Sequence, residues 1–201
     1  MATIAVYCSS SERIDRRHVE LATRVGEELA RRGHDLVTGG GSISCMGAVA
    51  RAVRAGGRRT VGVIPQALVD LEVADHDADE LVVSADMRAR KGEMDRRADA
   101  FLTLPGGLGT LEELLEIWVA HTLAMHAKPV VVLDPDGLYA PLRDQVELMV
   151  DRGFVRAAAR DAVHWSTTAG DALDVIEDRL ANPRPGGPVV PAAEDLLEAE
   201  H

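Results

Sequence analysis

Three glycines, a proline and two neighbouring carboxylates stand together in residues 104–113, which read Leu-Pro-Gly-Gly-Leu-Gly-Thr-Leu-Glu-Glu. The apolar run 100–104 before them is typical of a buried strand, and residues 113–124 are typical of a helix. Backbone amides at a helix N-terminus bind anions, because the aligned peptide dipoles place roughly half a positive charge there. The segment therefore predicts a phosphate site beside two acids, Glu112 and Glu113.

Glu113 has two interpretations from spacing alone. Thr110 and Glu113 form the pattern T-x-x-E, a capping box that contributes about 1 kcal/mol to helix stability. A cap needs only one acid, however, and Glu112 supplies a second in the same predicted turn, facing the glycine loop. The pattern leaves open whether Glu113 only caps the helix or also acts on a ligand.

The predicted helix 86–98 carries two cations on a face that we expect to point inward. Met87, Arg90, Lys91 and Met94 recur at i, i+3, i+4 and i+7, and the methionines indicate that this face meets the core. A buried arginine needs an anionic partner, which here is one of the two acids above or a bound ligand. A plain salt bridge, or a side chain that reaches out to water, is the alternative.

Two further turns follow predicted strands and carry residue types that bind phosphate. The glycine-rich turn 39–47 contains Gly40 and Gly41, and the polar turn after the first strand contains Ser9. Neither GxGxxG nor GxxxxGK[ST] is present, so the sequence does not predict a dinucleotide-binding or P-loop site.

Short apolar strands alternate with helices along the chain, and each strand is a continuous apolar run. This pattern predicts an α/β fold: a Rossmann-like doubly wound parallel sheet with helices on both faces. Ligands bind at the carboxyl ends of such strands, so the turns described above can face one crevice. We expect one domain over residues 1–181 and a disordered acidic tail over 182–201. The predicted strands are 3–8, 35–38, 60–64, 81–84, 100–104, 129–133 and 162–165, and the predicted helices are 15–32, 48–55, 86–98, 113–124, 138–152 and 169–180.

Composition argues against several classes of partner. The 201 residues have a formal net charge of −11 and a pI of about 5.0, which argues against nucleic acid or an anionic membrane as partner. We find no secretory leader, no apolar run of about 18 residues and no CxxC motif, so we expect a reduced, cytoplasmic protein. Asp75, His76 and the acids after them lack the spacing of a metal site, so we expect a solvated acidic loop and no metal.

Taken together, these motifs resemble the LOG (Lonely Guy) family of cytokinin riboside 5'-monophosphate phosphoribohydrolases, whose members often carry the label lysine decarboxylase. The family signature PGGxGTxxE is present at 105–113, and its helix signature M-x-x-R-K-x-x-M is present at 87–94. The family turn GGGxxGLMG appears at 39–47, and its opening C-G-S-S strand end appears at 7–10. The resemblance covers about residues 3–180.

The resemblance implies a homodimeric enzyme that hydrolyses the N-glycosidic bond of cytokinin-type or adenosine nucleoside 5'-monophosphates, as in cytokinin biosynthesis. The products are the free purine base and ribose 5-phosphate, and no cofactor is implied. Arg90 and Glu113 correspond to the family's catalytic pair. The residues expected at the substrate are Met87, Lys91, Gly107, Leu108, Gly109, Thr110, Leu111, Glu112, Gly40, Gly41 and Ser9.

Three positions depart from the family pattern. Ser44 and Ser9 stand where the family usually has glycine, which leaves the backbone path of the phosphate region open. Ala67 stands where plant members carry an acid, so that contact is not expected here.

Two other functions fit part of the sequence. Related Rossmann-like proteins carry nucleotides or molybdenum cofactor without converting them, and such a carrier needs the glycine turns but not Arg90 and Glu113 together. A pyridoxal-phosphate decarboxylase needs a lysine for its Schiff base, and the chain contains only Lys91 and Lys128. Spacing does not determine which purine is preferred, or whether dimers pair further.

Overall fold

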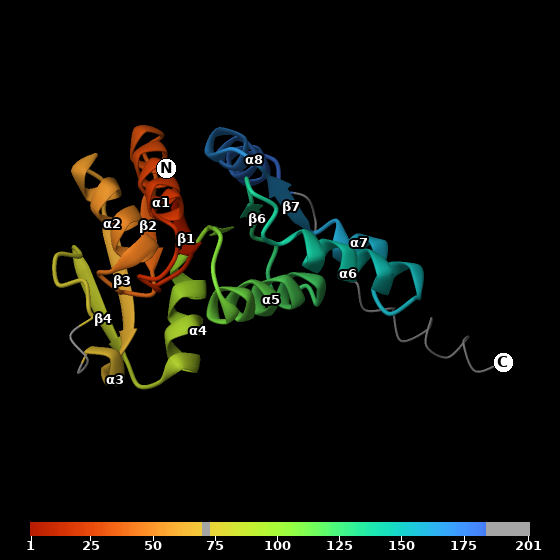
Figure 1. The fold of residues 1–201 in the computed structure, drawn as a ribbon, viewed down its shortest axis with the longest axis horizontal. Coiled ribbons are helices and arrows are strands. Elements are labelled where there is room, and N and C mark those ends of the chain that lie inside the picture. The colour runs from red at the N-terminus through yellow and green to blue at the C-terminus, as the bar shows by residue number, and fades with distance from the viewer. Residues whose placement is uncertain (70–72, 184–201) are drawn as a thin grey trace.

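A computed structural model of the chain describes residues 1–69 and 73–183 (Figure 1). All but the first two residues of the expected tail 182–201 lie outside the described residues. The described strands form one sheet in the order β4-β3-β2-β1-β5-β6-β7, and every neighbouring pair is parallel. The predicted Rossmann-like α/β fold is therefore confirmed.

The helices and strands have the following bounds. The strands are β1 (Thr3–Tyr7), β2 (Asp35–Thr38), β3 (Thr60–Pro65), β4 (Glu80–Ser84), β5 (Ala100–Thr103), β6 (Val130–Leu133) and β7 (Val163–Ser166). The helices are α1 (Arg16–Arg31), α2 (Ser44–Ala55), α3 (Gln66–Val69), α4 (Met87–Arg97), α5 (Leu108–Thr122), α6 (Ala140–Asp151), α7 (Ala157–Arg160) and α8 (Ala169–Ala181). Within the described residues, no helix has the length and apolar character needed to cross a membrane.

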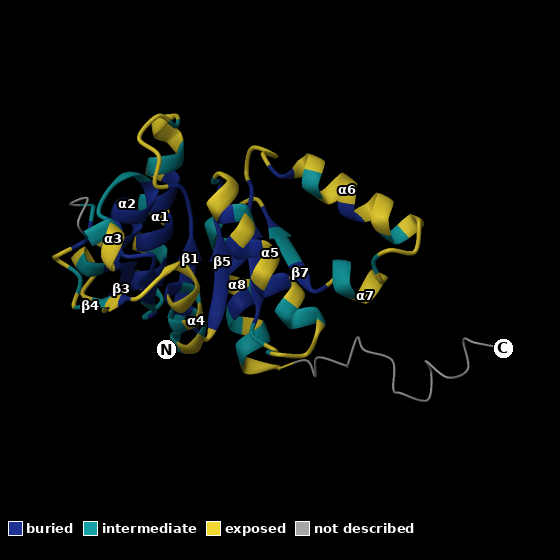
Figure 2. Ribbon diagram, turned by 90° about the horizontal axis from the view of Figure 1, so that it is seen from below, coloured by how far each residue is buried: buried dark blue, intermediate teal, exposed yellow. Residues whose placement is uncertain are grey.

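The sheet separates two hydrophobic cores. One core packs α1, α2 and α8 against one face of the sheet, and the other packs α4, α5 and α6 against the opposite face. Figure 1 shows these two helical layers, and Figure 2 shows that β1 and β5 are buried between them. The strand order reverses between β1 and β5, because the chain builds outward from β1 to β4 and then returns to place β5 on the other side. In this fold class, such a switch point is where ligands bind.

Local sequence explains how α4 is held in place. Asp86 precedes the helix, and its carboxylate accepts a hydrogen bond of 2.7 Å from the amide of Ala89. This cap satisfies one of the orphan amides at the helix start. Ser84, the last residue of β4, donates its hydroxyl to the Asp86 carbonyl at 3.1 Å. The start of α4, and therefore the direction of its first turns, is fixed by these two bonds.

The start of α5 differs from the prediction. The helix begins at Leu108 rather than at 113, and its N-cap is Gly107. Thr110 is therefore the third helical residue, and Glu113 lies in the second turn, so the capping-box interpretation is wrong. The error arose because glycine and proline favour a turn, whereas here the chain becomes helical directly after Gly107.

The acidic segment after residue 74 is a loop up to Asp79, and His76, Asp77 and Asp79 are exposed as expected, but Asp75 is buried and Glu80 belongs to a strand. The Asp75 carboxylate is buried and lies 2.8 Å from Arg54. Asp79 accepts a 2.7 Å hydrogen bond from the amide of Thr60, and Glu80 begins the edge strand β4. These acids fasten the segment to the sheet edge. Among the described residues, no group of three or more potential ligands could hold a metal ion.

His121 in the last turn of α5 and His126 just after the helix meet in a partly buried cluster. The chain turns back at Ala124, which has a φ of 56°, and this brings the ring of His126 to 5.4 Å from that of His121. His126 Nε2 lies 2.9 Å from the carbonyl oxygen of Ile117, and its Nδ1 accepts from the amide of Lys128 at 3.2 Å. A neutral ring satisfies both contacts, because Nε2–H donates to Ile117 and Nδ1 accepts from Lys128. A protonated ring would place an Nδ1–H group against the amide N–H of Lys128.

We expect this cluster to make stability depend on pH. Burial and mutual repulsion lower the pKa of His121, and burial lowers the pKa of His126, in each case below 6.5. Below that pH the unfolded chain binds protons that the folded chain does not, so the free energy of unfolding falls as the pH falls. Between pH 7.5 and pH 5.5, the free energy of unfolding measured by urea denaturation should fall less for His126→Gln than for the unmodified protein. Glutamine does not titrate, and it retains a donor toward the Ile117 carbonyl. Equal falls in the variant and the unmodified protein would contradict this.

Candidate active site

A pocket of about 470 Å³ opens at the carboxyl ends of the central strands. Its walls come from the turns after β1, β2 and β5, from β3 and from the helices α2, α3, α4 and α5. The lining residues are Cys8, Ser9, Ser10, Ser11, Gly39, Gly41, Ile43, Met46, Ile64, Leu68, Val73, Met87, Arg90, Gly107, Gly109, Thr110, Glu112 and Glu113. The pocket therefore lies at the switch point of the sheet and draws on all three turns noted in the sequence.

Arg90 is buried in the pocket wall although it is charged. Its side chain comes from the first turn of α4 and is 6% exposed. Nε donates to the carbonyl of Val63 at 3.1 Å, and Nη1 lies 3.5 Å from Oε1 of Glu113. Met87, which also lines the pocket, lies beside the guanidinium, with 3.8 Å between Nη1 and the Met87 sulfur. The guanidinium is therefore fixed by β3 and faces the carboxylate of α5.

The Glu113 carboxylate is the second buried charge of the pocket, with 8% of the residue exposed. Burial raises the pKa of Glu113 to about 7, although the positive charge of Arg90 opposes the rise. A carboxylate with a pKa close to neutrality can accept a proton in a reaction and release it afterwards. This property, together with its place in the second turn of α5, distinguishes Glu113 from a helix cap.

The first turn of α5 is open toward the pocket. No side chain caps the N-cap residue Gly107, and both Gly107 and Gly109 are exposed and line the pocket. The first amides of a helix have no partner within the helix, so those of Leu108, Gly109 and Thr110 are available to an anion. The side chain of Leu108 is 86% exposed and does not belong to the pocket lining.

The second glycine turn lies opposite α5. Gly41 lines the pocket, whereas Gly40 lies behind it with a φ of 73° and is packed closely against Val63 and Ile64. Ser44, which replaces a glycine of the family pattern, has a φ of 51°, in the left-handed region that glycine favours. Its hydroxyl donates to the Ser11 carbonyl at 2.6 Å, so this serine joins the two turns.

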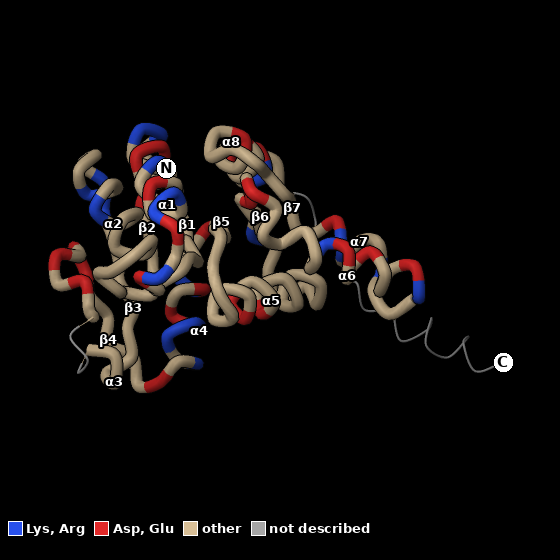
Figure 3. The backbone as a smooth tube through the Cα atoms, in the orientation of Figure 1, with Lys and Arg blue, Asp and Glu red and all other residues tan. Residues whose placement is uncertain are grey.

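Lys91 and Leu111 do not line the pocket. The ammonium of Lys91 pairs with the carboxylates of Glu112 and Glu116 and so ties α4 to α5. Figure 3 shows basic positions of α4 beside acidic positions of α5. Burial opposes protonation of Lys91, but the hydrogen bonds to the two glutamates outweigh it and raise the pKa of its amine. A protonated, paired amine is a poor candidate for a Schiff base, which argues against the pyridoxal-phosphate alternative.

The sequence did not point to the apolar part of the pocket. Ile43, Met46, Ile64, Leu68 and Val73 form it, and they come from three different segments. Each of them looks like an ordinary core residue in the sequence, so no local signal separates them from the core. Gly39 was also missed, although it begins the glycine run.

Gly39 gives Arg90 its space. A Cβ atom at Gly39 would lie 1.5 Å from Nη2 of Arg90, and no positive φ explains the glycine at this position. Gly106 has a similar role for Thr110, because a Cβ atom there would lie 2.2 Å from the threonine Oγ1. The two glycines therefore let side chains from other elements approach the turns.

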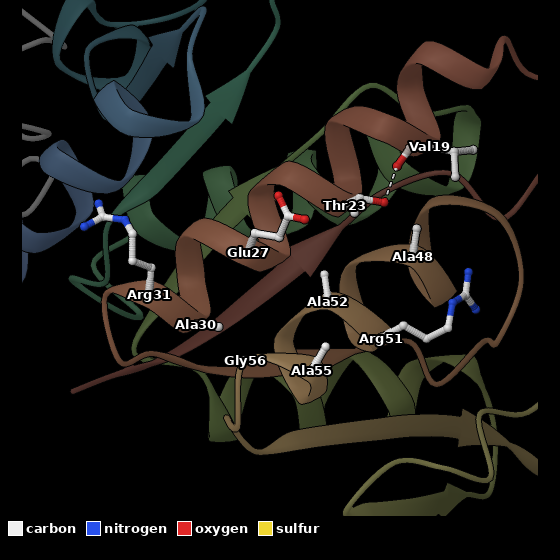
Figure 4. A pocket seen from close by; sticks show the side chains of 10 residues that line it. All are labelled: Val19, Thr23, Glu27, Ala30, Arg31, Ala48, Arg51, Ala52, Ala55 and Gly56. Carbon is white, nitrogen blue, oxygen red and sulfur yellow. Dashed lines mark hydrogen bonds between the residues drawn. The ribbon is translucent and has the colours of Figure 1, made fainter.

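A larger groove of about 640 Å³ lies between α1 and α2 on the outside of the molecule (Figure 4). Its floor consists mainly of alanines, and its basic side chains are already bonded: Arg51 donates to the Ser42 carbonyl at 2.9 Å, and Arg31 pairs with Glu28. The Thr23 hydroxyl in this groove is bonded to the Val19 carbonyl at 3.1 Å, and the Glu27 carboxylate is exposed, so the groove lining lacks a buried charge that could act on a ligand. The smaller pocket at the strand ends is the better candidate for chemistry.

The fold and the pocket define a Rossmann-like α/β protein that holds a buried arginine and glutamate at the carboxyl edge of its sheet. The chain belongs to the LOG family: the family model described as possible lysine decarboxylase matches residues 46–176. The resemblance noted from the motifs is thereby confirmed.

Named relatives agree with this assignment. The cytokinin riboside 5'-monophosphate phosphoribohydrolase of Mycobacterium marinum is 50% identical over 171 residues, which cover 85% of this chain and 91% of the relative. The protein of the same name from Mycobacterium tuberculosis is 48% identical with the same coverage. The Oryza sativa enzyme LOG is 43% identical over 175 residues, which cover 87% of this chain and 72% of the relative.

A solved structure shares the fold at lower identity. The molybdenum cofactor binding protein of Rippkaea orientalis matches with a TM-score of 0.67 and 21% identity, covering 88% of this chain and 96% of that chain. At that identity the likeness shows a common architecture and does not bear on function.

Proposed function

We propose that this protein hydrolyses the N-glycosidic bond of purine nucleoside 5'-monophosphates, releasing the free base and ribose 5-phosphate. The observation that carries the proposal is the buried pair of Arg90 and Glu113, 3.5 Å apart, beside an uncapped helix N-terminus. Relatives that are 41–50% identical are named phosphoribohydrolases of cytokinin riboside 5'-monophosphate, which supports this reaction over simple binding.

We propose one orientation of the nucleotide along the pocket. In the proposal, the 5'-phosphate binds the amides of Gly107, Gly109 and Thr110 together with the turn at Gly40 and Gly41. The nucleotide then extends over the buried pair, with Glu113 near the ribose and the other end among the apolar residues of the pocket. Ser9, Met87 and Glu112 line the same space, whereas the side chains of Lys91, Leu108 and Leu111 lie outside the pocket lining and only the Leu108 amide can reach the phosphate.

The reaction needs stabilisation of a ribosyl cation and help for the leaving base. In the proposal, the bond between C1' and the purine nitrogen breaks, and its electron pair leaves with the base. The Glu113 carboxylate stabilises the positive charge on the ribose and accepts a proton from the water that adds to C1'. Arg90 donates a hydrogen bond to the departing purine, which takes up a proton from solvent, while Glu113 releases the proton of the water to solvent. Water is therefore the only second reactant.

The alternative is a carrier that binds a nucleotide or molybdenum cofactor without converting it. Incubation of the purified protein with AMP, followed by chromatography, separates the two functions. Free adenine in amounts that exceed the enzyme supports hydrolysis, whereas AMP that remains bound and intact supports a carrier. The same assay with N6-modified analogues of AMP identifies the preferred base.

A homodimer in the cytoplasm belongs to the same proposal. Exposed apolar side chains of α5, namely Leu108, Leu115 and Val119, recur with helical spacing and offer a surface to a second copy. Cys8 and Cys45 are free thiols, as in reducing compartments. The net charge of −11 supports the absence of nucleic acid and membrane partners. Analytical ultracentrifugation measures the oligomeric state directly.

Replacement of Gly39 tests whether the position of Arg90 matters. We expect Gly39→Ala to lower kcat about 100-fold, because the new methyl group would displace the guanidinium and small misplacements can have effects of that size. Gly92→Ala is the matched control, since Gly92 is exposed on α4. A Cβ atom added there would meet only the side chain of Arg96, at 3.8 Å. Steady-state kinetics with AMP measure both variants. Activity of Gly39→Ala within twofold of the unmodified protein would show that Arg90 needs no such space.

A further inference from the structure

A tyrosine that directly precedes α6 forms a hydrogen bond to the backbone of the glycine loop before α5. The hydroxyl of Tyr139 donates to the carbonyl of Leu104 at 3.0 Å and lies 3.5 Å from the carbonyl of Gly106. Tyr139 is 3% exposed and does not line the pocket. It therefore contacts the loop backbone between β5 and α5 on the side away from a ligand.

Tyr139 is itself fixed by a buried carboxylate. Asp134, directly after β6, accepts hydrogen bonds from the amides of Leu138 and Tyr139, each at 2.9 Å. The amide of Asp134 in turn donates to the carbonyl of Ser166 in β7 at 2.8 Å. This chain of bonds gives the tyrosine a rigid foundation in the sheet, so the hydroxyl position is well defined.

The hydroxyl is a permanent donor. Burial raises the pKa of Tyr139 well above its ordinary value, so the proton stays on the oxygen throughout the physiological range. Two carbonyls converge on this one proton, and both belong to the segment that leads into Gly107. Loss of the donor would leave a buried carbonyl without this hydrogen bond, which is costly enough to move the loop.

We propose that Tyr139 is a positioning residue that holds the loop 104–107 so that the first amides of α5 meet the substrate phosphate. The inference rests on the proposed function for the identity of the ligand. Tyr139 touches neither the substrate nor the reacting atoms in this account. Its effect reaches the phosphate end of the ligand and not the base.

Binding without turnover tests this directly. Glu113→Gln serves as a background in which AMP and adenosine bind but are not cleaved, and Tyr139→Phe is added to it. We expect Tyr139→Phe to weaken AMP binding about five- to tenfold and to leave adenosine binding within twofold, as measured by calorimetry. Otherwise unmodified enzyme carrying Tyr139→Phe should show the same rise in KM for AMP, with kcat within about threefold.

Two further variants serve as a control and as an independent test of the role of Tyr139. Thr23→Val removes the hydroxyl bond to the Val19 carbonyl on α1, 3.1 Å long, and should change neither affinity. Asp134→Asn weakens the foundation of Tyr139 while leaving its side chain intact, and should reduce AMP affinity selectively as well. Unchanged AMP affinity in Tyr139→Phe, or equal losses for AMP and adenosine, would overturn the inference. If the unmodified protein releases no adenine but the selective loss of AMP binding occurs, the proposed reaction fails and the role of Tyr139 stands.

Discussion

Glu113→Gln is expected to lower kcat for AMP hydrolysis about 1,000-fold while KM changes less than about threefold. Glutamine keeps the shape of the side chain and a hydrogen-bond acceptor toward Arg90, but it can neither accept the proton of the attacking water nor neutralise a ribosyl cation. Because α5 begins at Leu108 and Glu113 lies in its second turn, the substitution removes no capping interaction. The substitution does remove the countercharge of the buried Arg90 guanidinium, 3.5 Å away, so we expect a lower melting temperature for the variant. Initial rates of adenine release, measured well below that temperature, report the loss of activity separately from the loss of stability.

The matched control for Glu113 is its neighbour. Glu112 also lines the pocket, but its carboxylate is largely exposed and pairs with Lys91. Glu112→Gln should retain activity within about tenfold, since an exposed ion pair contributes little. If Glu113→Gln keeps a tenth of the activity or more, the carboxylate does not carry the chemistry.

The same assignment fixes the direction of the pH dependence. The active form of Glu113 is the carboxylate, and its pKa is about 7 in the free enzyme. As the pH falls below that value the carboxyl group takes up a proton, so kcat/KM should fall up to tenfold for each further pH unit. This limb should be absent from the residual activity of Glu113→Gln.

Arg90→Met is the second substitution with a large expected effect, a fall in kcat of about 100-fold or more. The variant removes the hydrogen-bond donor for the leaving base and the positive charge that lowers the pKa of Glu113. A buried carboxylate without its partner takes up a proton more readily, so the acid limb of the pH profile should move above pH 7. Profiles of kcat/KM from pH 5.5 to 9 measure both effects.

A surface arginine on the same helix provides the comparison. Arg88 is exposed on α4 and is absent from the pocket lining, so Arg88→Met should leave both the rate and the profile unchanged. An Arg90→Met variant whose acid limb stays near pH 7 would show that the guanidinium does not act on Glu113.

Much of the fold was predictable because its strands are buried on both faces. Continuous apolar runs such as Val130–Leu133, separated by turns, define a parallel sheet without help from tertiary structure. The start of α5 was not predictable, because Gly107 and Gly109 have weak helix propensity and the pattern from Thr110 to Glu113 imitates a cap. Tertiary packing decided between turn and helix there.

The candidate site was predictable only in part. The spacing on α4 indicated an inward cation and the loop indicated two acids, but the sequence could not say that Arg90 faces Glu113 while Lys91 faces Glu112. The contacts of Gly39 with Arg90 and of Tyr139 with the loop depend on elements far apart in the chain. Residue spacing within a short stretch of sequence does not indicate such long-range contacts.

The most direct test of the central claim is a single-turnover reaction with enzyme in excess over AMP. Adenine, ribose 5-phosphate and remaining AMP are quantified together for the unmodified protein and for Glu113→Gln. The account predicts that adenine and ribose 5-phosphate appear one for one as AMP disappears, and that Glu113→Gln leaves AMP intact over the same time. Intact AMP with the unmodified protein, or equal rates for the two proteins, would contradict it.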